Sequence, residues 1–364
     1  MKKIFIGIDV SKETIDVSVL NPDESTDAEY LGQYANVPSG YSLMIKDIRC
    51  MGKVPADGQW LFCCETTGAY DRPMCYWLVE HGHRIWRESA LQIKRSMGIR
   101  RGKNDKADSM MIAEYAWRHA NKAHIFQKPD RNLAALKDLF LYRQSLVDKR
   151  KAAMVRSGEA KGLAGASSDA ARFIRRNAAK EVRRLEQSIE QCEQQIMKII
   201  QSDESLDKNY RHVTSVKGMG FVSAVALIVF SGNFQAIHTA NKMATYCGVA
   251  SFRERSGTTL DRRADVSSLS NRRLKGILTM AALLAVRFNT DIKLYFDRLM
   301  SAGKPYGIAL NNVKNKLLHI AYSLVKNDCD FELDHERKRK ERLVLNIIIM
   351  IIKNTTIMVV GRRK

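Results

Sequence analysis

The sequence lacks any Cys-x-x-Cys pair, although it contains seven cysteines: Cys50, Cys63, Cys64, Cys75, Cys192, Cys247 and Cys329. An odd total with scattered positions excludes a disulfide framework and provides no zinc-binding spacing. We therefore expect buried free thiols in a protein of a reducing cytoplasm.

Long hydrophobic runs are also missing. The segment Met1–Gly7 has two lysines and leads directly into a charged strand, without the apolar core of a signal peptide. The longest apolar stretch, Leu343–Ile352, contains Asn346 and stops at Lys353. A spanning helix needs about 20 apolar residues. We therefore expect neither secretion nor a membrane partner, and we assign no role to the basic and apolar tail over 335–364.

Acidic residues are outnumbered, with 39 Asp and Glu against 60 Lys and Arg in 364 residues, a formal net charge of +21. Such an excess indicates a polyanionic partner, with nucleic acid ahead of a membrane surface. An apolar fraction of 45% at this length allows two or three domains with real cores. A disordered basic tail is thereby excluded.

Residues 1–128 have the pattern of an α/β domain. The expected elements are a strand hairpin over Lys3–Leu20, a strand over Gln59–Cys64, a helix within Thr66–Gly82 with Pro73 in its first turn, and a short strand over Arg84–Arg87. Strands mixed with helices in this way are typical of an α/β fold.

Residues 129–205 are predicted to form a helical coiled-coil region. Apolar residues recur at spacings of three and four, as in a heptad seam, at Val182, Leu185, Ile189, Cys192, Ile196 and Ile199. The alternative is a long helix packed on its own domain. Glycines within Arg156–Ser168 predict a turn between two antiparallel helices.

Residues 206–334 are expected to form a third, mostly helical domain. Within Val213–Phe230, Gly218-Met219-Gly220 separates two apolar helical patterns. We interpret this as a helix-hairpin-helix-like element in which Lys217, Gly218 and Gly220 contact phosphate. The alternative is that these glycines simply end helices. The basic run His335–Arg342 contacts either phosphate or only solvent.

Four carboxylates in the first domain are the strongest indication of chemistry. Asp9 ends the first strand, Glu65 follows the strand over Gln59–Cys64, and Asp105 and Asp108 open a helix. Residues three apart share one helix face, and converging carboxylates repel unless cations lie between them. The pattern predicts two Mg²⁺ ions, an arrangement suited to displacement at a phosphodiester. Taken singly, each acid has an ordinary reading as a turn or capping residue.

Basic residues accompany the acids, and we expect them to hold a phosphate backbone. They are Lys94, Arg95, Arg100, Arg101 and Lys103. A second basic segment, Ala240–Asp265, carries Ser256-Gly257 after a helix that ends around Tyr246. A serine there can attack a phosphodiester, although taken alone Ser256 is better read as a turn residue. The phosphate contacts expected around it are Arg253, Arg255, Arg262 and Arg263.

Five motifs occur in an order that identifies a family. They are IGIDVSKETIDVSV, CCETTGAY, LQIKRSMGIRRGKNDKADSMMIAEYA, SVKGMGFVSAVALI and TYCGVASFRERSG. This succession resembles the DEDD-type transposases of bacterial insertion sequences, in particular insertion-sequence family one-ten, the recombinases guided by a bridge RNA. The resemblance extends over roughly residues 3–330.

The resemblance implies a RuvC-like (ribonuclease H-like) amino-terminal domain whose Mg²⁺-binding acids are Asp9, Glu65, Asp105 and Asp108. It implies that Ser256, in the carboxy-terminal transposase domain, forms a transient phosphoserine link to DNA at a composite site. A guide RNA would pair with donor and target DNA. The resemblance also implies dimerisation through the helical region 129–205, with dimers joining into a tetramer that is associated with the nucleoid when bound to DNA.

The sequence departs from the family in the loop around the serine. Family members commonly have Pro and a second Ser where this chain has Ala250-Ser251 and Arg255-Ser256. Ser251 is therefore a competing nucleophile, although no glycine follows it. Two other functions stay open from the residues: a Holliday-junction-resolvase-like nuclease that uses the acids and water, and a non-catalytic nucleic-acid-binding protein.

Overall fold

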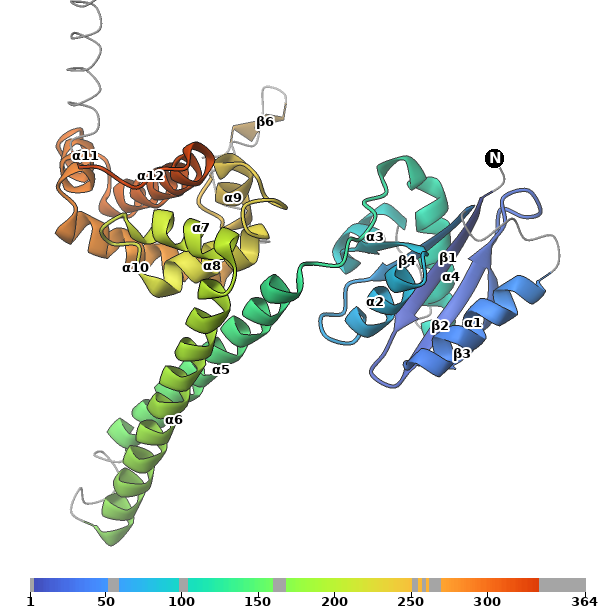
Figure 1. The fold of residues 1–364 in the computed structure, drawn as a ribbon, viewed down its shortest axis with the longest axis horizontal. Helices are drawn as coiled ribbons and strands as arrows, with labels where there is room; N and C mark the ends of the chain where they lie inside the picture. Colours follow the sequence, from blue (N-terminus) through green and yellow to red (C-terminus); the bar gives the residue numbers. More distant parts are fainter. Residues whose placement is uncertain are drawn as a thin grey trace, which may run out of the picture. The chain divides into compact units, whose positions relative to one another are not determined.

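A computed structural model describes residues 3–51, 59–97, 104–159, 168–250, 255–256, 260–261 and 270–333. The chain divides into two compact units, Met1–Lys128 and Pro129–Lys364. Figure 1 shows the first unit in blue to teal, with a mixed sheet and helices, and the second in green to red, built mainly of helices. An α/β domain followed by a helical region is therefore confirmed, whereas the finer division of the second unit at residue 205 stays a prediction.

The described part of the first unit contains five strands in one sheet of order β3-β2-β1-β4-β5. Its elements are β1 Ile4–Val10, β2 Thr14–Leu20, β3 Glu29–Ala35, α1 Pro38–Cys50, β4 Trp60–Glu65, α2 Arg72–Glu80, β5 Arg84–Glu88, α3 Ala90–Met97, α4 Asp105–Arg118 and the short 3₁₀ helix η2 Ala120–Lys122. Strands β1, β2 and β3 pair antiparallel. Strands β1, β4 and β5 pair parallel.

The sequence patterns located most of this unit but missed four elements. The hairpin β1–β2 is confirmed, and the strand expected at Gln59–Cys64 is β4. Strand β3, helices α1 and α3 and the 3₁₀ helix η2 were not predicted. Strand β3 is only partly buried and has no regular apolar alternation. Helix α2 begins at Arg72, later than Thr66, with Pro73 in its first turn as expected.

Side chains of the sheet alternate between two apolar clusters. Ile6, Ile8 and Phe62 belong to a cluster with side chains of α1 and α2. Phe5, Leu61 and further side chains belong to a second cluster with α3 and α4. The sheet is therefore covered by helices on both faces, and successive residues of β1 and β4 point into different environments.

The second unit has one large apolar core that draws on all of its longer helices. Its elements are α5 Arg131–Glu159, α6 Asp169–Gln201, α7 Glu204–Thr214, α8 Phe221–Ser231, α9 Ala240–Tyr246, β6 Arg255–Ser256, β7 Leu260–Asp261, α10 Arg272–Phe288, α11 Thr290–Ser301 and α12 Tyr306–Asn327. Helix α8 is apolar on nearly all sides because it lies in this core. Within the described ranges, no helix is long and apolar enough to cross a membrane.

Helices α5 and α6 lie side by side along most of their length (Figure 1). The predicted seam packs within the chain: the Cys192 thiol donates a hydrogen bond to the Leu139 carbonyl at 3.4 Å, and Arg143 pairs with Glu193 at 2.7 Å. Helix α5 continues to Glu159, so the turn predicted to start at Arg156 begins too early. Pairing of this hairpin with a second copy stays a prediction.

All seven cysteines are free, and five are buried. The expectation of burial is wrong for Cys50 and Cys329, which are exposed. Cys50 is the last residue of α1, and Cys329 follows the end of α12 at Asn327. Helix ends of this kind face solvent, so the apolar character of a cysteine does not by itself place it inside.

Gly218 is held in place by helix α10. Its φ is +106°, and a Cβ atom there would lie 2.5 Å from the Cα atom of Ala285. We expect Gly218→Ala to lower the unfolding free energy of the helical unit by about 2 kcal/mol, because strain and overlap with backbone both oppose it. The measurement is urea unfolding followed by far-ultraviolet circular dichroism.

The matched control is Gly276→Ala in helix α10, where an added Cβ would meet nothing within 4 Å. This substitution is expected to raise the unfolding free energy by up to about 1 kcal/mol, because alanine favours helix over glycine. Equal effects of the two substitutions would contradict the packing of Gly218 on Ala285.

Candidate active site

The backbone brings four carboxylates toward one edge of the sheet. Strands β1 and β4 are parallel and their last registered pair is Ile8 with Cys64, so Asp9 and Glu65 follow at the same edge. Helix α4 begins there at Asp105, after Asn104, whose side chain accepts a 2.7 Å hydrogen bond from the N–H of Ala107. The first turn of α4 therefore carries Asp105 and Asp108 toward the strand ends.

Gly7 permits the close approach of α4 to the sheet. A Cβ atom at Gly7 would lie 2.2 Å from the carbonyl oxygen of Ser109 and 2.3 Å from the nitrogen of Ala113. Beside it, the buried hydroxyls of Ser18 and Ser109 are hydrogen-bonded at 2.7 Å. The backbone of α4 thus rests directly on β1, two residues before Asp9.

The electrostatic environment of Asp9 shows that the other acids lie near it, although in the described part of the chain their oxygens do not form a group of three within 4.8 Å of one another. Burial first, and then the negative charges of Asp108, Asp105, Glu65 and Asp16 in that order, together raise the pKa of Asp9 to about 6. A carboxyl that loses its proton so reluctantly lies in a field that favours a bound cation. Carboxylate oxygens are the ligand type that hard divalent metals prefer, and closer approach of these acids around such an ion stays a prediction.

Asp16 is a fifth acid that the sequence patterns missed. It lies opposite Asp9 in the β1–β2 register and is buried. Its carboxylate accepts hydrogen bonds from the Tyr30 hydroxyl at 2.7 Å and from the Gln33 amide at 3.1 Å. Asp16 therefore adds negative charge beside Asp9, while its own oxygens accept hydrogen bonds from neighbouring side chains. Its position across the hairpin turn, mirroring that of Asp9, is the signal by which the sequence could have revealed it.

Of the basic residues expected near the acids, the structure describes two, both exposed on α3. The Lys94 amine lies 4.0 Å from a carboxylate oxygen of Glu65, and Arg95 is its neighbour. Lys94 thus sits at the rim of the acidic cluster, where an ammonium group can meet a phosphate. The other expected contacts, Arg100, Arg101 and Lys103, lie outside the described residues.

The raised pKa of Asp9 predicts a pH-dependent component of stability. Between the usual value of 3.8 and about 6, the folded state holds a proton on Asp9 that the unfolded state has lost. Stability therefore falls as pH rises through this window, and the loss is complete above it. Asp9→Asn keeps the neutral form at every pH. In chelator, we expect the variant to be more stable than the parent protein by an amount that is near zero at pH 4 and largest above pH 6. Urea unfolding measures this difference.

Ser256 lies in the second unit, in the two-residue strand β6 that pairs antiparallel with β7, opposite Leu260. In the same backbone register, Arg255 lies opposite Asp261. The competing Ser251 lies outside the described residues, as do the remaining expected phosphate contacts Arg253, Arg262 and Arg263. The structure thus places Ser256 in a short hairpin, and its role stays a prediction.

The glycine hairpin connects α7 to α8, as expected. Gly220 is the residue before α8, and both Gly220 and Lys217 are exposed. Gly218, in contrast, packs on α10. Contact of phosphate with Lys217 and with the start of α8 stays a prediction.

Comparison with known proteins assigns the chain to a family. A model for the DEDD domain of IS110 transposases matches residues 6–158, and a second model, described as "Transposase IS116/IS110/IS902 family", matches residues 210–297. The chain belongs to the IS110 transposase family. As a member of this family it is a DNA transposase or recombinase, and its DEDD domain implies dependence on a divalent metal.

Two relatives match nearly the whole IS110-family chain. The pilin gene-inverting protein of Moraxella lacunata is 23% identical over 340 residues, which cover 91% of this chain and 98% of that protein. The pilin gene-inverting protein of Moraxella bovis is 22% identical over the same shares. An uncharacterized 43.6 kDa protein of the insertion element IS110 from Streptomyces coelicolor is 25% identical over 120 residues, 33% of this chain and 29% of that protein.

Proposed function

We propose that this transposase cleaves and rejoins DNA strands while its insertion sequence moves, with a RuvC-like metal site in the first unit. Asp9, Glu65, Asp105 and Asp108 would hold two Mg²⁺ ions. The raised pKa of Asp9, produced by burial and by the charges of the other acids, is the observation that carries this proposal. Bound cations would neutralise the charge that develops on phosphate oxygens during displacement.

We propose Ser256 as the nucleophile. Its hydroxyl oxygen would bond to phosphorus while a deoxyribose oxygen leaves, and reversal of this exchange onto another strand would rejoin the DNA. Support comes from its place in a basic segment within residues 210–297, the range matched by the second transposase model. Arg253, Arg255, Arg262 and Arg263 would hold the phosphates around it.

A guide RNA and further copies of the chain complete the proposal. The net charge of +21 exceeds what one short DNA contact needs, which supports separate surfaces for donor and target DNA and for RNA. The long α5–α6 hairpin, with exposed side chains such as Tyr142, Val155 and Phe173, supports dimerisation through the helical region and assembly into a tetramer. Pairing with RNA would select the DNA sequence.

Ser256→Ala is the decisive experiment. Purified protein with Mg²⁺, the non-coding RNA of its element, and donor and target DNA is expected to recombine and to yield a covalent protein–DNA product. The alanine variant is expected to lose recombination by about 10⁴-fold or more, because the attacking oxygen is gone. The readouts are recombinant product by sequencing and covalent product by denaturing electrophoresis.

Ser251→Ala is the matched control, because Ser251 is the competing serine in the same segment. It is expected to keep both products. Loss in Ser251→Ala with retention in Ser256→Ala would move the nucleophile to Ser251. Full cleavage by Ser256→Ala without a covalent product would instead select hydrolysis by water at the acids, as in a Holliday-junction resolvase.

A second candidate reaction is inversion of a DNA segment between two sites. It is favoured by the pilin gene-inverting proteins, which match 91% of this chain. Plasmids that carry the element's recombination sites in opposite orientation on one molecule, or on separate molecules, distinguish the two reactions. Products only from the single molecule would select inversion, and products from separate molecules would select transposition.

A further inference from the structure

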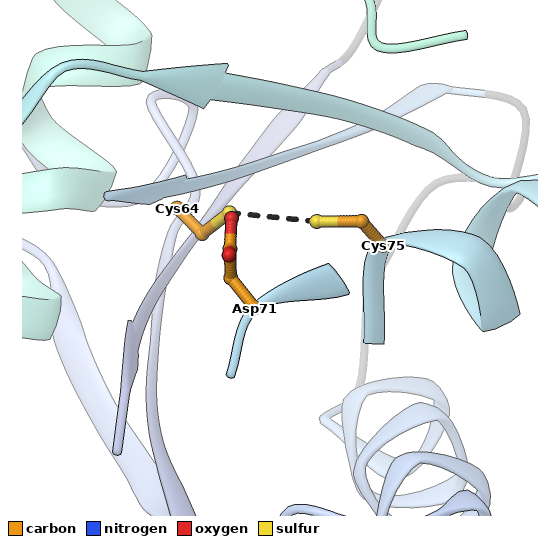
Figure 2. Close-up of side chains that lie close together, drawn as sticks. All are labelled: Cys64, Asp71 and Cys75. Carbon is orange, nitrogen blue, oxygen red and sulfur yellow. Dashed lines mark hydrogen bonds between the residues drawn. The ribbon is translucent and has the colours of Figure 1, made fainter. Parts of the chain in front are cut away.

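A second cluster of possible metal ligands lies on the sheet face opposite the acids. Cys64 is next to Glu65 in β4, but it points into the apolar cluster with α1 and α2. There it meets Cys75, in the first half of α2, and Asp71, the residue before that helix. Figure 2 shows the three side chains directed toward one another.

The two sulfur atoms have a separation that suits a shared cation. Sγ of Cys64 and Sγ of Cys75 lie 3.8 Å apart. Two thiolates bound tetrahedrally to Zn²⁺ at about 2.3 Å have sulfur atoms about 3.8 Å apart. A carboxylate oxygen of Asp71 completes a triangle in which all ligand atoms lie within 4.8 Å of one another. A single small cation can therefore reach all three.

Asp71 provides a second, independent indication. Its side chain is completely buried, and its Oδ2 lies 2.6 Å from both Nε and Nη2 of Arg87. Its Oδ1 is buried without a hydrogen-bond partner in the described part of the chain, and it does not cap α2. A buried carboxylate oxygen with no partner is costly. Ligation through one oxygen, with the other held by a donor, is how protein carboxylates commonly bind metals.

Charge also favours a divalent cation at this position. The guanidinium of Arg87 neutralises Asp71, and Arg87 is itself held over the ring of Phe126 at 5.1 Å. Two thiolates then balance one Zn²⁺, so the buried group of five would be neutral overall. Sulfur ligands select Zn²⁺ over Mg²⁺, which prefers oxygen. The cluster thus differs in ligand chemistry from the acids on the opposite face.

We propose that Cys64, Asp71 and Cys75 form a zinc site in the first unit. Binding replaces the two thiol protons by one Zn²⁺, with two Zn–S bonds and one Zn–O bond to Asp71, and water takes the fourth position. The spacing Cys-x₆-Asp-x₃-Cys contains no Cys-x-x-Cys pair, so the sequence patterns gave no sign of it. The ion would fasten the start of α2 to β4 immediately before Glu65.

Cobalt spectroscopy tests the proposal in the full-length protein. Protein freed of metal with chelator and reductant is titrated with Co²⁺. We expect thiolate-to-cobalt charge-transfer bands and visible bands of tetrahedral cobalt, saturating at one ion per chain and bleached by Zn²⁺. Cobalt at the acids would be bound by oxygen alone and give no such charge-transfer bands. Absence of these bands would overturn the proposal.

Cys63→Ser is the matched control, because Cys63 is equally buried in β4 but belongs to the opposite face. We expect it to keep the bands, while Cys64→Ser and Cys75→Ser lose them. Asp71→Asn is expected to weaken Co²⁺ binding by about 10- to 100-fold. Bands that persist in Cys64→Ser, or that disappear equally in Cys63→Ser, contradict the assignment.

Native mass spectrometry of the unmutated protein gives a measurement that does not depend on the folding of variants. The expected zinc-bound form is heavier by one zinc less two protons. Alkylation with iodoacetamide and peptide mapping should then show Cys64 and Cys75 protected by Zn²⁺, and reactive after chelation and partial unfolding. A Cys64–Cys75 disulfide in protein prepared with zinc would overturn the proposal.

Discussion

Asp9→Asn is expected to abolish recombination while stabilising the metal-free α/β unit. Asparagine removes a negative charge from a cation site, and loss of metal-assisted charge neutralisation should lower the rate by about 1,000-fold or more. The same change removes a buried charge and its repulsion with Asp108, Asp105 and Glu65; burial and this repulsion together raise the pKa of Asp9 to about 6. At pH 7.5 in chelator, the variant should therefore unfold at a higher urea concentration than the parent.

The stability of the first unit can be followed separately from that of the second. All four tryptophans, Trp60, Trp77, Trp86 and Trp117, belong to Met1–Lys128. Tryptophan fluorescence thus reports unfolding of this unit, and calorimetric titration with Mg²⁺ reports loss of the cation site. Magnesium should stabilise the parent and affect the variant little.

Asp27→Asn is the control for Asp9→Asn, because Asp27 is an exposed acid in the connection before β3. It makes the same change of charge in the same unit and should leave recombination and Mg²⁺ binding unaltered. Asp9→Asn protein that recombines like the parent would refute the metal-site assignment. A variant that is less stable than the parent in chelator would refute the repulsion argument.

Gly7→Ala is the second substitution with a large expected effect. The added Cβ would lie 2.2–2.9 Å from backbone atoms of Ser109 and Ala113, which no side-chain rotation can relieve. Helix α4 would have to move away from β1, carrying Asp105 and Asp108 with it. Since overpacking of this kind costs about 3 kcal/mol, we expect the first unit to lose about that much stability and the protein to lose Mg²⁺ binding.

Tryptophan fluorescence during urea unfolding measures the stability change of Gly7→Ala, and calorimetry measures Mg²⁺ binding. Gly276→Ala is the control, because it makes the same change in the other unit with open space around it. Recombination by Gly7→Ala at the parent's level would contradict the close docking of α4. A loss of Mg²⁺ binding in a variant that is still folded would show that Mg²⁺ binding depends on the position of α4 and not only on the stability of the unit.

Local patterns were sufficient to predict the elements that carry the acids. Alternation and β-branched residues indicated β1, β2 and β4, and the polar segment after Lys103 indicated the start of α4. These signals are local because strand alternation and helix capping involve residues close in sequence. Strand β3 escaped prediction because its environment, partly exposed beside β2, is set by the tertiary structure.

Electrostatic coupling and close packing depend on residues far apart in sequence. The influence of Asp16 on Asp9 follows from the hairpin register, and the approach of α4 follows from Gly7, about 100 residues away in sequence. The sequence patterns therefore named the four acids but not the fifth, and not the glycine on which their convergence depends.

By itself, the sequence determined a basic chain with a polyanionic partner, an α/β domain ahead of a helical region, and motifs typical of a transposase family. These follow from composition, periodicity and order along the chain. Only the tertiary structure decided which side chains meet. Glu65 and Cys64 are neighbours in β4, yet alternation in the strand sends one to the acids and the other to Asp71 and Cys75, because contacts depend on the face of the sheet.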